Sequence, residues 1–268
     1  MRTDRGRKNE KKDEAMDQAR KVIVFDTEAA LVSFVMKIWR RTALTAVAQR
    51  GSMRAAISGG KTPLGFYRAM GEHARDLPWD RTTLFLVDER FVPHTDAQSN
   101  FGMIRKVLLE ALPLARENVH AVETQGLTGE EAAERYEREL IRVFSLKPHE
   151  LPRFDLIMLG MGQDGHVASL FPGSALLSET RRLVGYADRE NGLTGRVTLT
   201  MPVLNGARSV IFLIEGLDKA ETLKKVIEER DASLPATRVR AVDGDVLFAV
   251  DKEAADKLTP NAYVKGAP

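Results

Sequence analysis

Short apolar runs alternate with longer amphipathic stretches from Lys21 onward. The apolar runs have the length of buried strands, and the amphipathic stretches have the length and period of helices. This alternation predicts an α/β fold in which an open, mostly parallel sheet carries helices on both faces. We expect strands at residues 22–25, 54–58, 83–87, 154–159, 182–187, 196–200, 209–214 and 246–250.

The amphipathic stretches predict the helices between these strands. They cover residues 27–49, 63–73, 100–112, 129–146 and 218–230, and a terminal helix is expected after the last strand. Asp26 or Thr27 can cap the first helix, because both side chains accept hydrogen bonds from free backbone N–H groups. Neither an internal repeat nor an obvious linker interrupts the pattern, so residues 21–268 are predicted to form one domain.

Residues 1–20 form a charged tail of different character. They contain seven Lys and Arg and five Asp and Glu, with almost no apolar side chains. Such a segment cannot bury an apolar face, which predicts a disordered or weakly helical extension. Its acids interleave with its bases, which disfavours an arm for RNA or membrane. It also lacks the apolar core of a secretory signal.

Composition excludes several classes of function. The 268 residues include no cysteine, so disulfides, thiolate nucleophiles and cysteine metal sites are absent. The formal net charge is only +2, far from the basic stripe of a nucleic-acid-binding protein. No run has the length of a membrane span. We expect a cytoplasmic protein without nucleic-acid or membrane partners, and the sequence leaves open whether it is a monomer or a homodimer.

Ligands of open parallel sheets bind beyond the carboxyl ends of the strands, so the polar residues that follow each strand are the candidates for a site. The first such segment consists of Ser58, Gly59, Gly60, Lys61, Thr62 and Pro63. Its glycines allow close approach to a ligand, and Thr62 before Pro63 is a suitable helix cap. Free N–H groups at this helix start would suit a phosphate. A plain strand–helix turn is an equally good interpretation.

The second segment follows the next predicted strand and contains Asp88, Glu89 and Arg90. Two acids and an arginine there could orient sugar hydroxyls, although a solvated ion-pair cluster is the simpler interpretation. Ser99 and Asn100 follow, and either can cap the next helix.

The third segment, residues 160–173, is the richest in candidate chemistry. A glycine-studded loop after the apolar strand 154–159 presents Asp164 and His166, two residues apart. Histidine can accept a proton from water near neutral pH, and an adjacent carboxylate can fix its tautomer. We therefore expect His166 to be a general base oriented by Asp164. The other four histidines lack such framing, and a metal site would need more ligands at binding spacing.

A fourth group consists of single cations near predicted element boundaries. Arg196 begins a strand and Lys219 begins a helix, and each can pair with a phosphate. Without further context, a surface charge is the better explanation of either residue.

Together these segments resemble the family of 6-phosphogluconolactonases and glucosamine-6-phosphate deaminases. The matching stretches are residues 57–63, 88–93, 99–100, 160–173 and 196–205, in family order. The resemblance implies a Rossmann-like fold and hydrolysis of 6-phospho-D-glucono-1,5-lactone in the oxidative pentose phosphate pathway, without a cofactor. It places the general base on His166 and the phosphate-binding positions on Gly60, Lys61, Thr62, Arg196 and Lys219.

In the mechanism that follows, the phosphate binds the 58–63 loop and neighbouring cations while His166 takes a proton from the attacking water. Arg90 or a loop N–H would stabilise the oxyanion. Ser58, Gly59 and Asp88 are expected to contact the substrate. Ser169 is a poor nucleophile candidate because it lacks a nucleophile-elbow pattern.

Two other functions remain as alternatives. The deaminases carry Asn-Glu-Pro where this chain has Leu170-Phe171-Pro172, and the missing acid argues for simple hydrolysis. A noncatalytic sugar-phosphate sensor commonly adds a helix-turn-helix domain, for which the twenty-residue tail is too short.

Overall fold

The computed structural model describes residues 20–188, 194–241 and 244–267, so the predicted tail lies outside the described residues except for Arg20. The main sheet has eight strands in the order β11-β1-β10-β9-β6-β2-β3-β5, and every neighbouring pair is parallel. The strands are β1 (Arg20–Phe25), β2 (Met53–Ile57), β3 (Thr82–Leu86), β5 (Val119–His120), β6 (Leu156–Leu159), β9 (Val210–Ile214), β10 (Val246–Asp251) and β11 (Val264–Lys265).

A second, smaller sheet was not predicted. It consists of β4 (Asp88–Arg90), β8 (Arg196–Leu199) and β7 (Val184–Ala187), all paired antiparallel. Two of these segments were expected as strands and one as a loop. The apolar pattern of a segment can predict a strand, but it does not show which other strand pairs with it. The predicted open, mostly parallel sheet is therefore confirmed, with this small sheet added beside it.

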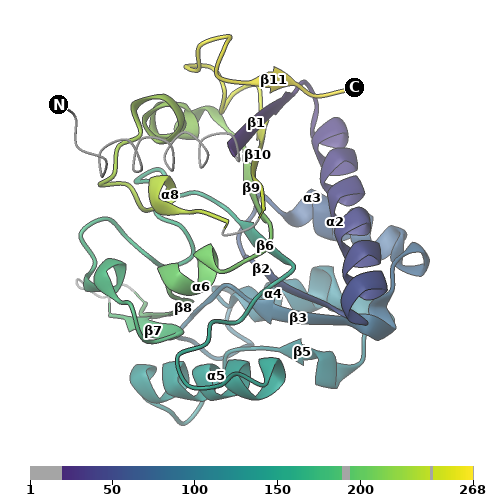
Figure 1. Cartoon of the computed structure of the whole chain (residues 1–268), viewed down its shortest axis with the longest axis vertical. Coiled ribbons are helices and arrows are strands. Elements are labelled where there is room, and N and C mark those ends of the chain that lie inside the picture. Colours follow the sequence, from purple (N-terminus) through teal and green to yellow (C-terminus); the bar gives the residue numbers. More distant parts are fainter. Residues whose placement is uncertain (1–19, 189–193, 242–243, 268) are drawn as a thin grey trace, which may run out of the picture.

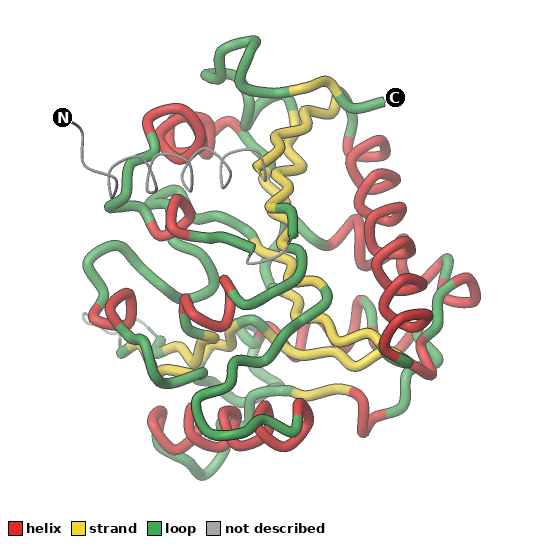
Figure 2. Tube along the Cα trace, viewed as in Figure 1, coloured by secondary structure: helices red, strands yellow, loops and turns green. Residues whose placement is uncertain are grey.

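Helices cover both faces of the main sheet (Figures 1 and 2). They are α2 (Glu28–Arg50), α3 (Leu64–Glu72), α4 (Asn100–Val107), α5 (Gly129–Phe144), α6 (Met201–Asn205), α7 (Ala220–Lys224) with a following π-helical turn (Lys225–Glu229), and α8 (Pro235–Arg238). Short 3-10 turns occupy Ala74–Asp76, Trp79–Arg81, Leu109–Ala111, Arg116–Asn118, Ala175–Ser178 and Leu217–Lys219. Thr27 caps α2 by accepting a hydrogen bond from Ala30 N, as predicted.

Alternate side chains along the strands point to opposite faces of the sheet and belong to two separate hydrophobic cores. One core contains Ile57, Met158 and Leu213 and packs against α2, α3 and α4. The other contains Leu159 and Phe212 and packs against α5, α8 and the loop after β6. Strands buried on both faces explain the continuous apolar runs in the sequence.

The terminal helix predicted after residue 250 is wrong. Residues 252–257 form turns, and the chain then adds β11 beside β1. The side chain of Asp251 accepts a hydrogen bond from Ala254 N at 2.7 Å, and Leu258 N donates to Ala255 O. These short-range bonds take the place of most of a helical i→i−4 ladder, and Pro260 prevents its continuation.

Candidate active site

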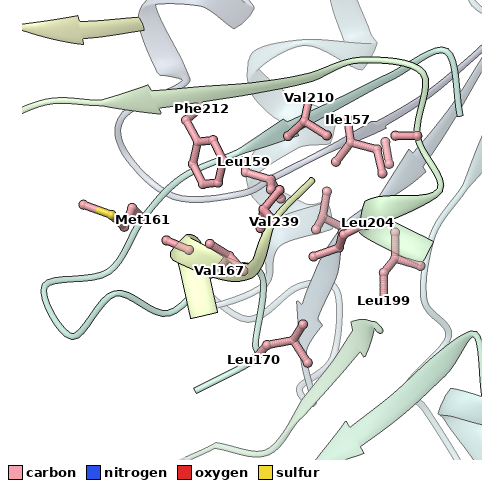
Figure 3. Close-up of a cluster of buried hydrophobic side chains, with 14 of the residues drawn as sticks. Ile157, Leu159, Met161, Val167, Leu170, Leu199, Leu204, Val210, Phe212 and Val239 are labelled. Atoms are coloured by element: carbon pink, nitrogen blue, oxygen red, sulfur yellow. The ribbon is translucent and has the colours of Figure 1, made fainter. Parts of the chain in front are cut away.

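The loop after β6 is anchored in the second core on both sides of His166. Met161, Val167 and Leu170 are all buried, and Figure 3 shows Met161 and Val167 beside Phe212 and Val239. Leu170 N donates to Val167 O at 2.9 Å, which closes a tight turn between the two anchors. The loop is therefore anchored by packing on both sides of His166, although it has no regular structure.

His166 and Asp164 form a hydrogen-bonded pair on this loop. The imidazole Nδ1 lies 2.5 Å from Asp164 Oδ1, and His166 N donates to the same oxygen at 3.2 Å. Nε2 has no hydrogen-bond partner within the described ranges, and a third of the side chain is exposed. The carboxylate accepts from the Nδ1–H tautomer, which leaves a lone pair on Nε2 for a proton.

The absence of a side chain at Gly162 makes room for this pair. A Cβ at this position would lie 2.0 Å from His166 Nδ1 and 2.5 Å from Asp164 Oδ1, so only glycine allows the pair to form. The ring of Phe171 lies against the imidazole, with 4.6 Å between the ring centroids. The imidazole is thus fixed by its carboxylate on one side and by packing on the other.

The charge state of Asp164 suits an orienting carboxylate. Partial burial alone would raise its pKa, but the charge and hydrogen bonds of His166 outweigh burial and lower the pKa below its ordinary value. Asp164 therefore remains ionised wherever a neutral His166 could act as a base.

The loop after β2 presents free backbone donors rather than a capped helix. Gly60 has a φ of +94°, and the N–H groups of Gly59, Gly60 and Lys61 have no acceptor in the described parts of the chain. The predicted Thr62 cap is wrong: Pro63 is the N-cap residue of α3, without a side-chain cap bond. Leu64 N bonds Lys61 O instead, so the helix begins one residue later. Successive free N–H groups of this kind are able to bind an anion.

Glu89 holds the start of α4 and forms no ion pair with Arg90. Its carboxylate is fully buried and accepts hydrogen bonds from the backbone N–H groups of Arg90, Asn100 and Phe101, each at 2.7 Å. Ser99 Oγ adds a fourth donor at 3.1 Å. Burial raises the pKa of Glu89 while these donors oppose the shift. Neither a sugar-orienting role nor a solvated ion-pair cluster fits this residue, which is structural.

Asp88 is the junction between the candidate loops. Its Oδ2 accepts a hydrogen bond from Ser169 Oγ at 2.6 Å, and its backbone O accepts one from Asn100 Nδ2 at 3.0 Å. Asn100 in turn lies against Gly59, where a Cβ would come within 2.0 Å of the amide oxygen. The His166 loop, the small sheet and the glycine loop are therefore tied together through one buried residue, Asp88.

Ser169 is fully buried and serves this junction, which removes it as a nucleophile. Its backbone N–H donates to Thr198 Oγ1 at 3.1 Å in the small sheet. The preceding Ala168 has a φ of +51°, an unfavourable conformation for a residue with a side chain. Strained backbone of this kind is common where a loop must hold a functional side chain in place.

Arg90 and Arg196 are directly opposite each other in the small sheet, in the antiparallel register of β4 and β8. The Arg90 guanidinium donates to Gln98 O at 2.5 Å, while its buried Nε has no acceptor among the described residues. This register places two guanidinium-bearing residues opposite each other in neighbouring strands.

Lys219 is linked to the His166 loop through the carboxylate of Asp218. Its Nζ is 3.2 Å from Asp218, and the same carboxylate accepts a hydrogen bond from Gln163 Nε2 at 2.7 Å. Thr222 Oγ1 also donates to Gln163 O. The predicted cation is therefore attached to the loop that carries the predicted base.

Apart from the direct pair of Asp164 and His166, the predicted Gly59, Asp88 and Lys219 are connected to this pair, within the described residues, only through intermediate residues. The predicted Ser58 points away from the loop and donates to Met158 O at 2.7 Å, joining β2 to β6. The side chain of Lys61 is exposed, without a hydrogen bond or ion pair among the described residues. Sequence analysis missed Asn100 and Ser169 as linking residues, because polar side chains at a cap or in a loop carry no sign of a distant partner.

No helix of the described residues is long and apolar enough to cross a membrane. Nor do three or more of their His, Asp and Glu side chains gather where they could hold a metal ion.

The comparisons with known proteins agree over nearly the whole chain. Residues 26–248 match the family described as glucosamine-6-phosphate isomerases/6-phosphogluconolactonase. A 6-phosphogluconolactonase of Synechocystis sp. is 35% identical over 87% of this chain and 94% of its own. One of Rattus norvegicus is 36% identical over 89% and 93%. The crystal structure of a 6-phosphogluconolactonase from Thermotoga maritima is 36% identical, with a TM-score of 0.75 over 87% of this chain and all of the other.

Proposed function

Because the chain belongs to the family of glucosamine-6-phosphate isomerases and 6-phosphogluconolactonases, we propose that it hydrolyses 6-phospho-D-glucono-1,5-lactone to 6-phosphogluconate. The enzyme is then a carboxylic ester hydrolase of sugar-phosphate metabolism. One observation carries the chemical step: the Asp164–His166 pair, in which Nδ1 is occupied and Nε2 is left free.

The phosphate of the substrate binds at the glycine loop and the cations around it. The free N–H groups of Gly59, Gly60 and Lys61 supply directional donors, and the side chains of Lys61 and Thr62 border them. Arg196 and Lys219 supply positive charge. Arg196 lies opposite Arg90 in the small sheet, and its guanidinium can pair with the phosphate.

At the other end of the substrate, His166 Nε2 accepts a proton from water as its oxygen attacks the lactone carbonyl carbon. The carbonyl oxygen becomes an oxyanion, which a backbone N–H of a neighbouring loop or Arg90 stabilises. Collapse of this intermediate breaks the bond to the ring oxygen, which takes the proton back from His166. Asp164 stays ionised throughout and stabilises the imidazolium that forms between the two transfers.

The glucosamine-6-phosphate isomerases of the same family perform a different reaction, and one feature disfavours it here. Ring opening and proton shuttling at an amino sugar call for an additional acid near the base. In this chain the residue at the corresponding place is Phe171, whose ring packs on His166. An apolar ring can shield the imidazole, but it cannot transfer a proton.

The direct test is an assay of the purified protein with freshly generated 6-phosphogluconolactone and, separately, with glucosamine-6-phosphate. We expect lactone hydrolysis and no amine release. His166→Ala should lower kcat by about two orders of magnitude or more, while the thermal unfolding midpoint stays near that of the parent. A near-parental rate for this variant would exclude His166 as the base, and turnover of the amino sugar alone would exclude the lactonase.

We further propose that residues 21–268 act as one domain in the cytoplasm, without nucleic-acid partners, as a monomer or a homodimer. The absence of cysteine and the near-neutral net charge of +2 support this location and partner set. Light scattering after gel filtration measures the oligomeric state directly.

A further inference from the structure

A cavity of about 580 Å³ opens at the amino-terminal edge of the main sheet, on the side opposite the candidate active site. Arg50 ends α2, Arg54 lies in β2, and Asp155 and Arg208 precede β6 and β9. Because parallel strands all begin at this edge, residues from distant parts of the sequence converge there. The volume is in the range of small-ligand sites.

The cavity is lined by more positive than negative side chains. Arg50, Arg54 and Arg208 outnumber the carboxylates of Asp155 and Glu150. A phosphate monoester carries nearly two negative charges at neutral pH. The cavity and such a group are therefore electrostatically complementary.

Asp155 arranges the arginines without using all of their donors. Its Oδ1 lies 2.9 Å from Arg50 Nε, 2.8 Å from Arg50 Nη2 and 3.5 Å from Arg208 Nε, and its Oδ2 accepts from Arg54 N at 2.8 Å. The terminal Nη groups of Arg54 and Arg208 have no acceptor within the residues described. Two guanidinium groups thus present free, directed donors to the cavity, as a phosphate requires.

One wall of the cavity is apolar. Phe144, Leu146 and Leu151 line it, and the guanidinium of Arg54 lies over the Phe144 ring, 4.9 Å from its centroid. His149 borders the same wall in a left-handed conformation, with a φ of +69°. A free phosphate or sulfate would leave this wall unused, whereas a ligand with a flat ring beside its phosphate would cover it.

We propose that this cavity is a second ligand site, distinct from the lactone site, which binds a nucleoside monophosphate. The phosphate pairs with Arg54 and Arg208, and the base packs on the apolar wall beside them, at Leu146 and Leu151. This proposal does not depend on the lactonase activity, because it concerns binding at the other edge of the sheet.

Isothermal titration calorimetry of the full chain with adenosine monophosphate, adenosine and inorganic phosphate tests the proposal. We expect one adenosine monophosphate per chain, with adenosine and phosphate each binding at least about tenfold more weakly. The double variant Arg54→Gln/Arg208→Gln should weaken nucleotide binding about tenfold or more. Arg75→Gln/Arg138→Gln, which removes two exposed arginines outside the cavity, is the matched control and should leave binding unchanged.

Saturation with 6-phosphogluconate separates the two sites. Unchanged nucleotide affinity in its presence supports a separate site, and competition would place the nucleotide in the lactone site and overturn the proposal. Equal affinity for inorganic phosphate would overturn the nucleotide as ligand. Absence of binding at millimolar nucleotide, or equal binding by the cavity variant and its parent, would overturn the site itself. Circular dichroism and lactone turnover of each variant confirm that it is folded.

Discussion

The two edges of the main sheet use carboxylates in opposite ways. At the amino-terminal edge, Asp155 is buried and surrounded by donors from Arg50, Arg54 and Arg208. At the carboxyl-terminal edge, Asp164 is half exposed and holds a single imidazole, and Glu215 faces other acids. The first arrangement satisfies its carboxylate and leaves positive charge over. The second leaves acceptors unsatisfied, and unsatisfied acceptors are those that can take up a proton.

The largest expected effect on stability is at the amino-terminal edge of the main sheet. Asp155→Ala removes a buried acceptor from two guanidinium groups and from one backbone N–H, which should lower the free energy of unfolding by about 3 kcal/mol. Urea denaturation followed by circular dichroism measures the loss, and kcat for the lactone should stay near that of the parent. Asp155→Asn, which keeps the shape and one acceptor, should lose less. A loss below about 1 kcal/mol for the alanine variant would show that the arginines do not depend on this carboxylate.

Ser169→Ala tests the junction that connects the catalytic loops. The change leaves Asp88 Oδ2 buried without its 2.6 Å donor, so we expect a loss of about 2 kcal/mol in unfolding free energy and a lower kcat. Ser174→Ala, in the same loop region but with only a weak local bond at 3.3 Å, is the control. Equal stability of the two variants would mean that the Ser169 bond does not stabilise the loop.

Asp164→Asn separates orientation from stability. Loss of the charge that holds the imidazole should reduce kcat by about tenfold, while the unfolding free energy changes by less than about 0.5 kcal/mol because the residue is half exposed. The exposed pair of His73 and Asp76, 3.6 Å apart, provides the control: Asp76→Asn should change neither quantity. Unchanged kcat in Asp164→Asn would assign the carboxylate to loop structure alone.

The smallest expected effect comes from Glu215, whose contribution to stability depends on pH. Burial, together with Asp251 and Glu28, raises the pKa of this carboxyl to about 7. The folded chain therefore keeps a proton that the unfolded chain releases near its ordinary pKa of 4.5. Stability from this group is complete below the lower value and is lost as the pH rises through about 7.

Glu215→Gln should accordingly be more stable than the parent at pH 8, by about 1 kcal/mol once solvent screening of this partly exposed group is included. At pH 4 the two proteins should be equally stable. Thermal unfolding of both proteins between pH 4 and pH 8 measures the difference, and parallel curves across this range would show that Glu215 ionises normally in the fold.

The sequence alone was sufficient to predict most of the parallel sheet. The runs at residues 22–25, 154–159 and 209–214 are strands of the main sheet because a strand buried on both faces needs only apolar side chains, whatever its neighbours. The same local logic correctly predicted the caps Thr27 and Ser99. It failed for the terminal helix, where side-chain and turn hydrogen bonds near Asp251 compete with helical ones.

For the site, the sequence determined the pair of Asp164 and His166, because the two residues are near each other along the chain and lie within a glycine loop. Only the tertiary structure decided which distant residues support them. Asp88 joins Ser169, Asn100 joins Gly59, and Arg90 lies opposite Arg196 because a small antiparallel sheet forms beside the main one. Pairing between strands far apart in the chain depends on the packing of the whole fold, so no local pattern of residues specifies it.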